Sequence, residues 1–264
     1  MHIYMIMPAH MESERISNAI SDYSSSLCSK YRNSIRIIIV TDREGDTAMT
    51  ASRLTKGKKN FSVMASARRE GKGGAIIHTL RMLCGKVRLD RSDTVIFVDA
   101  DDSVKGTQIS KLIEQLESGK YDAVIGSRYV KGSKIIGKIT MGRYVASRAY
   151  NALVRMLFGI NLKDTQCGIK LFKAGALCSV LPRLALVDMS FDVNVLYELK
   201  VSGATIHEAP ITFYQKNEGS KVNLARQAPQ MFLTTLGFRI SRSRFNALVP
   251  VKLKGFIYEM VKGW

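Results

Sequence analysis

Three aspartates follow a short apolar run near the middle of the 264-residue chain. Val95-Ile96-Phe97-Val98 has the composition of a buried strand, and Asp99, Asp101 and Asp102 come directly after it. In open α/β sheets, ligands bind at the carboxyl ends of the strands. Carboxylates gathered there repel one another unless a cation or a proton relieves the repulsion. A hard divalent cation such as Mg²⁺ or Mn²⁺ prefers oxygen ligands and often shares them with diphosphate, so the aspartates predict a metal site for a phosphorylated ligand.

The residues alone leave two other interpretations of these aspartates open. An acidic turn that caps the next helix would place the same side chains in solvent, and Asp-x-Asp is too short a motif to exclude it. Haloacid-dehalogenase-type phosphatases also carry Asp-x-Asp after an apolar strand, with the first aspartate as nucleophile. That strand lies near the N-terminus in those enzymes, whereas three strand-like runs come first here, and Ser103 stands where they favour Thr or Val. The sequence therefore favours a metal–diphosphate site over a phosphatase.

The first half of the chain contains the elements that would position these aspartates. Apolar runs rich in β-branched or aromatic residues predict strands over residues 3–7, 35–40, 61–65, 94–98 and 123–126. Helix-compatible stretches lie between them, over residues 14–30, 47–54, 75–83 and 107–116. Apolar strands that alternate with helices indicate an α/β fold whose mostly parallel sheet is covered by helices on both faces.

After residue 130 the pattern changes. Residues 131–138 predict a basic, glycine-containing loop, and a helical stretch over 142–158 follows. Residues 169–172, 190–199 and 206–213 then predict a strand, a helix and a strand. No repeat or low-complexity linker divides the chain, so we expect one α/β domain over residues 1–222 and a C-terminal extension over 223–264.

The formal net charge of +18 indicates an anionic partner or a strongly solvated surface. Residues 219–258 contain seven basic side chains and no acidic one, and apolar residues lie between them. A helix of this composition could lie on an anionic membrane or pack on the domain. Nucleic acid is the alternative partner, but no recognisable binding module supports it. We therefore expect an anionic membrane surface as a partner and no nucleic acid.

The cysteines and the apolar segments bear on where the protein acts. No run of about 18 apolar residues encodes a transmembrane helix, and residues 1–7 are too short for a signal peptide. The four cysteines are scattered without a Cys-x-x-Cys pair, which favours reduced thiols over a disulfide framework. We expect a peripheral protein on the cytoplasmic face of a membrane.

Six further motifs occur in order along the chain: Pro8-Ala9-His10-Met11-Glu12, Val40-Thr41-Asp42, Glu70-Gly71-Lys72-Gly73-Gly74, Gly126-Ser127-Arg128-Tyr129, Asp164-Thr165-Gln166-Cys167-Gly168 and Phe191-Asp192-Val193. With the aspartates they resemble the family-2 glycosyltransferases, and within them the polyprenyl-phosphate branch of dolichyl-phosphate β-glucosyltransferase and dolichol-phosphate mannosyltransferase. The resemblance implies the GT-A fold, a Rossmann-like, mostly parallel mixed sheet flanked by helices that binds a nucleotide sugar. The last two motifs are similar to the glucosyltransferase side.

The resemblance implies a set of donor-site residues. Asp99 and Asp101 match the pair that binds the metal, Mg²⁺ or Mn²⁺, and the diphosphate. Asp42 matches an acidic residue that reads the base, because a carboxylate accepts from a ring N–H. Glycines on either side of Lys72 would let the backbone come close to the nucleotide. The remaining matches to the nucleotide pocket and its phosphates are Pro8, Ala9, Glu12, Lys72 and Arg128.

The resemblance also implies an acceptor side. Arg143 and Ser147 look like contacts to an acceptor phosphate, and one helical turn separates them, so they share a face. Gln166, Lys170 and Asp192 lie in motifs that border this side.

Departures from the family pattern surround the base pocket. Met11 stands where the family usually has Asn, and Thr41 precedes Asp42 where it usually has a second aspartate. The nucleotide sugar therefore stays open between UDP-glucose and GDP-mannose.

The implied reaction is an inverting, metal-dependent transfer of a hexose, with glucose favoured over mannose, to dolichyl or another polyprenyl phosphate. Such an acceptor is largely ionised at neutral pH and needs positioning more than deprotonation. If the acceptor were a sugar hydroxyl of a glycan or glycolipid, a general base would be required, and Asp192 is the candidate.

Overall fold

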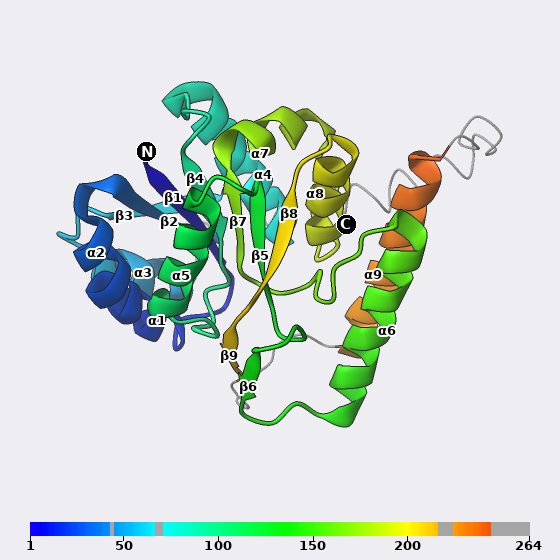
Figure 1. Ribbon diagram of the computed structural model, residues 1–264. Helices are drawn as coiled ribbons and strands as arrows, with labels where there is room; N and C mark the ends of the chain where they lie inside the picture. The colour runs from blue at the N-terminus through cyan, green and yellow to red at the C-terminus, as the bar shows by residue number, and fades with distance from the viewer. Residues whose placement is uncertain (43–44, 67–70, 216–223, 244–264) are drawn as a thin grey trace.

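The computed structural model describes residues 1–42, 45–66, 71–215 and 224–243, without the side chains of Asp42 and of residues 224–227. One sheet runs through the molecule, and helices cover both of its faces (Figure 1). The strands are β1 (Ile3–Ala9), β2 (Ile35–Asp42), β3 (Phe61–Ser66), β4 (Thr94–Phe97), β5 (Ala123–Ser127), β6 (Lys134–Ile136), β7 (Lys170–Lys173), β8 (Ile206–Pro210) and β9 (Thr212–Tyr214). The helices are α1 (Ile16–Tyr23), α2 (Ser29–Tyr31), α3 (Asp46–Thr55), α4 (Gly71–Met82), α5 (Gly106–Glu117), α6 (Met141–Phe158), α7 (Ala174–Val180), α8 (Phe191–Val201) and α9 (Leu224–Ser241).

The sheet has the strand order β3-β2-β1-β4-β7-β5-β8. Its pairs are parallel except those of β7, which runs antiparallel to both β4 and β5. The fold is thus α/β with a mixed, mostly parallel sheet, as the alternation of strands and helices predicted. Because β7 reverses between β4 and β5, these two strands run in the same direction and their carboxyl ends lie at one edge.

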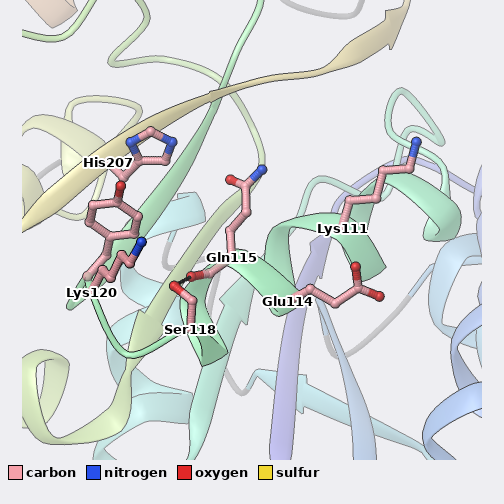
Figure 2. A pocket seen from close by; sticks show the side chains of 7 residues that line it. Lys111, Glu114, Gln115, Ser118, Lys120 and His207 are labelled. Atoms are coloured by element: carbon pink, nitrogen blue, oxygen red, sulfur yellow. Dashed lines mark hydrogen bonds between the residues drawn. The ribbon is translucent and has the colours of Figure 1, made fainter.

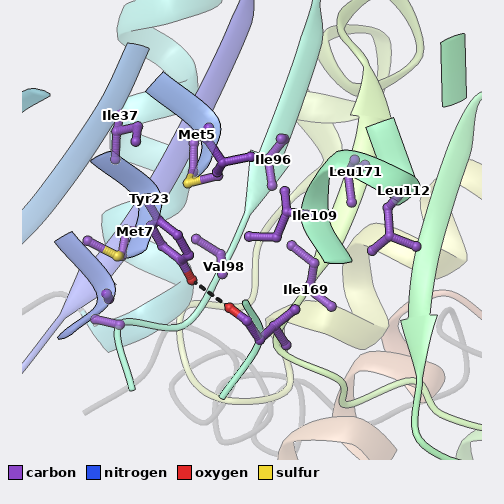
Figure 3. Close-up of a cluster of buried hydrophobic side chains, with 14 of the residues drawn as sticks. Met5, Met7, Tyr23, Ile37, Ile96, Val98, Ile109, Leu112, Ile169 and Leu171 are labelled. Carbon is purple, nitrogen blue, oxygen red and sulfur yellow. Dashed lines mark hydrogen bonds between the residues drawn. The ribbon is translucent and has the colours of Figure 1, made fainter. Parts of the chain in front are cut away.

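The strands read as continuous apolar runs because both faces of the sheet are buried. On one face, Met5, Met7 and Ile96 pack against α1 and α5, where the Tyr23 hydroxyl donates to the Val104 carbonyl at 3.1 Å (Figure 3). On the other face, Phe97 packs between rings of β7 and α8. Burial of both faces fixes the register of β4 and hence the position of the aspartates that follow it.

Two local predictions are wrong. The strand expected over residues 206–213 is divided, because the chain leaves the sheet at Pro210 and continues as β9, which pairs with β6. The loop expected over residues 131–138 contains β6, a three-residue strand too short for the sequence pattern to indicate. The short helix α7 was not expected either, since its sequence Ala-Gly-Ala-Leu-Cys-Ser-Val lacks a polar face.

The expectation of four separate reduced thiols is also wrong. Cys84 and Cys178 form a disulfide, with their Cα atoms 6.1 Å apart, whereas Cys28 and Cys167 are free. The pair is 94 residues apart in the sequence, but α7 packs on the same face of the sheet as the π-helical segment Leu83–Val87, which follows α4. The spacing of the cysteines in the sequence does not predict that these two lie side by side.

Helix α9 starts the region predicted as a C-terminal extension, and it packs along α6 (Figure 1). Phe238 is 1% exposed and stacks on Phe158, and the Arg239 guanidinium donates to the Leu157 carbonyl at 2.6 Å. Residues 244–264, the rest of the extension that could lie on a membrane or pack on the domain, lie outside the described residues. Within the described ranges, no helix combines the length and the apolar character needed to cross a bilayer.

Candidate active site

The carboxyl ends of the parallel strands bring the predicted donor residues to one edge of the sheet. Pro8 and Ala9 end β1 beside Val40 and Thr41 of β2, and Val98 continues β4 by donating to the Ile6 carbonyl at 3.1 Å. Asp99 therefore emerges next to the end of β1. Asp42 is the last residue of β2, at the same edge.

A chain of four charged side chains runs inward from Asp99. The Lys72 ammonium lies 2.9 Å from Asp99 Oδ1 and 3.4 Å from Asp192 Oδ2, and the Lys170 ammonium lies 2.8 Å from Asp192 Oδ1. Exposure falls along this chain, from 36% for Asp99 to 3% for Asp192 and 1% for Lys170. The four charges alternate in sign, so each carboxylate has a cationic partner.

The two lysines determine the ionisation of Asp192. Burial alone would raise the pKa of this carboxyl, but Lys170 and Lys72 outweigh burial and hold the pKa below its ordinary value. The Lys170 ammonium also donates to the Cys167 carbonyl at 2.5 Å. Asp192 is therefore a fixed anion engaged by two ammonium groups, which makes it a weak proton acceptor.

Asp101 is in the opposite situation. Burial and the neighbouring Asp99 raise the pKa of its carboxyl, against the opposing effect of Ser103, whose N–H donates to Oδ1 at 3.0 Å. Asp99 and Asp101 thus form a pair of carboxylates whose mutual repulsion a cation would relieve. Asp102 is separate from this pair: it has a left-handed backbone with φ 56° and pairs with Lys105 at 2.7 Å.

Two carboxylates with oxygen donors fit a hard divalent cation that takes its remaining ligands from diphosphate and water. The described part of the chain holds no cluster of three or more His, Cys, Asp or Glu side chains that could bind a metal unaided. The residues present therefore fit a metal shared with a ligand and do not form a complete protein cage.

Glycines at the site are required by contacts within the protein. A Cβ on Gly168 would lie 2.1 Å from Asp99 Oδ2, and one on Gly73 would lie 2.6 Å from the Phe191 Cβ. The amides of Gly73 and Gly74 donate to the Val187 carbonyl at 2.9 and 3.3 Å. We expected the glycines beside Lys72 to admit the nucleotide, but at Gly73 the close neighbour is α8.

Glu12 lies in the turn that precedes α1. Its carbonyl accepts from the amides of Arg15 and Ile16, and its carboxylate pairs with Arg15 at 2.9 Å. Met11, which precedes it, is 55% exposed and has a left-handed backbone with φ 55°. Asn, the usual family residue at this position, adopts that conformation more readily than Met.

Arg128 is held by a carboxylate of the protein. Its Nε and Nη2 donate to the two oxygens of Asp164 at 2.7 and 2.8 Å, and its backbone N–H donates to the same carboxylate at 3.0 Å. Tyr129 and Phe213 place their rings beside the guanidinium. The predicted phosphate contact would have to share Arg128 with Asp164, and the observed contacts tie β5 to the 164–168 loop.

The predicted acceptor residues lie on α6 and on that loop. Arg143 is exposed and Ser147 half-buried, both in the first half of α6, one turn apart as expected. Gln166 is half-buried, and its Nε2 atom is buried without a hydrogen-bond partner in the described part of the chain. Gln166 stands two residues before Gly168, whose backbone lies against Asp99. Its unpaired side-chain amide is therefore near the two aspartates. Lys170, by contrast, is buried against Asp192.

A surface pocket of about 500 Å³ lies elsewhere (Figure 2). It is lined by the end of α5, where Gln115 and Ser118 stand, and by Tyr121 stacked on His207 at 4.4 Å. These residues precede β5 or begin β8, at the amino ends of the strands, and none of them belongs to a predicted motif. The pocket is therefore separate from the candidate site.

The model of the glycosyl transferase family 2 matches residues 4–180 of the chain. The chain belongs to this family. Dolichyl-phosphate beta-glucosyltransferase of Saccharomyces cerevisiae is 30% identical over 245 residues, which cover 86% of this chain and 71% of the relative. Undecaprenyl-phosphate mannosyltransferase of Micrococcus luteus is 29% identical over 186 residues, covering 69% and 73%.

Solved structures agree with the GT-A fold of this glycosyltransferase. Mannosyl-3-phosphoglycerate synthase from Rubrobacter xylanophilus superposes with a TM-score of 0.66 at 13% identity, covering 95% of this chain and 76% of that one. Glucosyl-3-phosphoglycerate synthase from Mycobacterium tuberculosis, solved with Mn²⁺ and UDP-glucose, gives 0.61 at 17% identity, covering 90% and 79%.

Sequence reasoning missed three residues whose contacts hold the 164–168 loop in place. Asn151 on α6 accepts from the Thr165 amide and hydroxyl at 3.0 and 2.9 Å, and Glu208 on β8 accepts from the Asp164 amide at 2.7 Å. Asp164 is the first residue of the Asp164–Gly168 motif, but no contact or role was predicted for it. A buried Asn on the apolar face of α6 was the one available signal for such a contact.

Proposed function

We propose that this family-2 glycosyltransferase transfers a hexose, with glucose favoured, from a nucleoside diphosphate sugar to dolichyl or another polyprenyl phosphate, with inversion. The names of relatives that span most of this chain support the acceptor class and the choice of glucose first and mannose second. UDP-glucose is the favoured donor and GDP-mannose the alternative.

The observation that carries the choice of acceptor is the pairing of Asp192 with two lysines. A sugar hydroxyl must lose its proton during transfer and therefore needs a base. Asp192 was the candidate base, but its carboxylate is occupied by Lys170 at 2.8 Å and Lys72 at 3.4 Å. A phosphate acceptor already carries its charge and has no such requirement.

On the donor side, Asp99 and Asp101 would hold Mg²⁺ or Mn²⁺ together with the diphosphate. When bound, this cation would neutralise charge that develops on the leaving nucleoside diphosphate. Lys72 orients Asp99 and adds positive charge near the same group. The Mn²⁺ in the structure of the mycobacterial synthase supports this assignment.

On the acceptor side, Arg143 and Ser147 of α6 would bind the acceptor phosphate. Arg143→Ala should then lower kcat/KM for polyprenyl phosphate about 10- to 100-fold, the value of a hydrogen bond to a charged group. Arg155→Ala, on the same helix and also exposed, is the matched control and should retain activity. Equal activity of the two variants would refute the assignment of Arg143.

We also propose peripheral binding at a membrane surface, since the proposed acceptor is a lipid. The cytoplasmic face was predicted from the scattered cysteines. The Cys84–Cys178 disulfide removes that support, because disulfides are rare in the cytoplasm. The proposal therefore concerns the membrane surface and not a particular face of it.

The test combines labelled nucleotide sugars with two acceptors, a polyprenyl phosphate and the corresponding polyprenyl alcohol, in Mn²⁺ or Mg²⁺. The expected result is an organic-phase product from UDP-glucose or GDP-mannose with the phosphate and none with the alcohol. Asp101→Asn serves as the inactive control. Transfer to the alcohol, or no product with any donor, would refute the proposed function.

A further inference from the structure

Helix α6 leaves most of its first half in solvent. Its buried residues are Asn151, Val154 and Phe158, all in its second half. In Figure 1 the helix runs along one flank of the domain beside α9, and its first turns extend past the edge of the sheet. The first half of α6 therefore makes little use of packing against the domain. Apolar side chains at that end need an explanation other than the core.

Large apolar side chains cover this free end. Met141 is 75% exposed, Val145 55% and Tyr144 44%. Their spacing of three and four residues places them on one face of the helix, which we call the α6 face. Apolar side chains that gather on an exposed surface mark a contact with a partner or a membrane.

The segment that contains the α6 face carries only positive charges. Between Asp122 and Asp164, 41 residues carry eight lysines and arginines and no acidic side chain. Four of these are exposed and lie immediately before or within the start of α6, at Lys131, Lys134, Lys138 and Arg143. Apolar side chains bordered by lysine and arginine are typical of a helix that lies on anionic lipid headgroups, with a tyrosine at the interface.

The α6 face also lies on the side of the molecule where a lipid acceptor would arrive. The carboxyl ends of β4 and β5 share one edge of the sheet, and Asp99 follows the first of them. Residues 128–140 lead from the end of β5 through β6 to α6, and Lys134 there pairs with β9. The start of α6 is thereby tied to the edge that carries the active site.

We propose that the α6 face, Met141, Tyr144 and Val145, together with its flanking lysines, is the surface by which the enzyme docks on an anionic lipid bilayer. This inference rests on the proposed function for its purpose, since docking there would present the phosphate of a membrane-borne acceptor to the site. The docking element is then part of the transferase domain. It precedes, in the sequence, the C-terminal extension over residues 223–264, which was first considered for membrane binding.

Co-sedimentation tests the surface with phosphatidylcholine vesicles that contain or lack phosphatidylserine. The variant Met141→Ser/Val145→Ser should lower the partition onto anionic vesicles at least about tenfold, because it removes two insertable side chains. Lys134→Gln/Lys138→Gln should lower it by about fivefold per residue removed, and added salt should reduce that difference. Met49→Ser is the matched control, since Met49 on α3 is 73% exposed, and it should bind like the wild type.

Wild-type binding by the Met141→Ser/Val145→Ser variant would overturn the proposal. So would size-exclusion data that show a dimer of the wild type which this variant loses, because the face would then join two copies of the chain. Transfer assays separate this failure from failure of the function. The same variant should keep full transfer to a short, water-soluble isoprenyl phosphate and lose transfer to a long-chain acceptor in vesicles, whereas a wild type inactive with both acceptors would refute the proposed function alone.

Discussion

Replacing Lys170 with methionine should destabilise the enzyme strongly although the two side chains have similar length. Lys170 is 1% exposed and its ammonium lies 2.8 Å from Asp192, which is itself 3% exposed. The variant leaves a buried carboxylate with Lys72, 3.4 Å away, as its remaining cationic partner. Removal of one member of a buried ion pair costs about 3–5 kcal/mol. Since Lys72 stays in place, we expect the lower end of that range, about 3 kcal/mol.

The same variant should change how stability depends on pH. In the wild type the pKa of Asp192 is held below its ordinary value, so its contribution is present above the pKa of the unfolded state, about 3.9. That contribution disappears as the pH falls through the folded-state pKa. Without Lys170 the folded-state pKa of Asp192 rises toward or above its unfolded value, so protonation of this carboxyl should cost the variant less stability than it costs the wild type, and the stability difference between the two should shrink as the pH falls.

Urea unfolding followed by circular dichroism between pH 3 and pH 8 measures both effects. Lys173→Met is the matched control, because Lys173 lies on the same strand and donates to the Gly119 carbonyl at 3.3 Å in an exposed position. It should change the free energy of unfolding by less than about 1 kcal/mol. A loss below about 1 kcal/mol for Lys170→Met, or equal losses for the two variants, would refute the account of a charge network around Asp192.

Three further predictions concern the site and its support. Gly168→Ala should lower kcat about 100-fold in the transfer assay, because its Cβ would lie 2.1 Å from Asp99 Oδ2 and must displace that carboxylate; unchanged kcat would contradict the fixed position of Asp99. Cys84→Ser/Cys178→Ser should lower the free energy of unfolding by about 2–4 kcal/mol in urea, and dithiothreitol should reduce the stability of the wild type but not of the variant. Met11→Asn should raise the free energy of unfolding by about 1 kcal/mol, since it relieves a left-handed methionine; a loss of stability would show that the Met11 side chain contributes contacts worth more than the strain.

The sequence indicated the strands well because the sheet is buried on both faces. The run before Asp99 had to be apolar at every position, as Val95 and Phe97 pack on one side and Ile96 on the other. The short strand β6 could not be predicted, because its Lys134 and Ile136 are exposed and its identity depends on pairing with β9. Its partner β9 is separate from β8 because the chain leaves the large sheet at Pro210.

The candidate site was predicted as a set of residues but not as a set of contacts. Lys72, Lys170 and Asp192 were each found through their motifs, yet their mutual pairing spans up to 120 residues of sequence. Arg128 was expected to face a phosphate, and its pairing with Asp164 could not be inferred from either motif alone. Pairings of this kind depend on how the 164–168 loop and α8 return to the sheet, which local sequence does not encode.

Transfer of a hexose to the phosphate of a lipid leaves a phosphodiester in the product. Phosphorus and proton NMR of the purified organic-phase product test it most directly, with UDP-glucose and a polyprenyl phosphate as substrates. The expected product is a sugar phosphodiester with a β-anomeric proton, formed only with a divalent cation. A glycoside without phosphorus, or an α-linked phosphodiester, would contradict it.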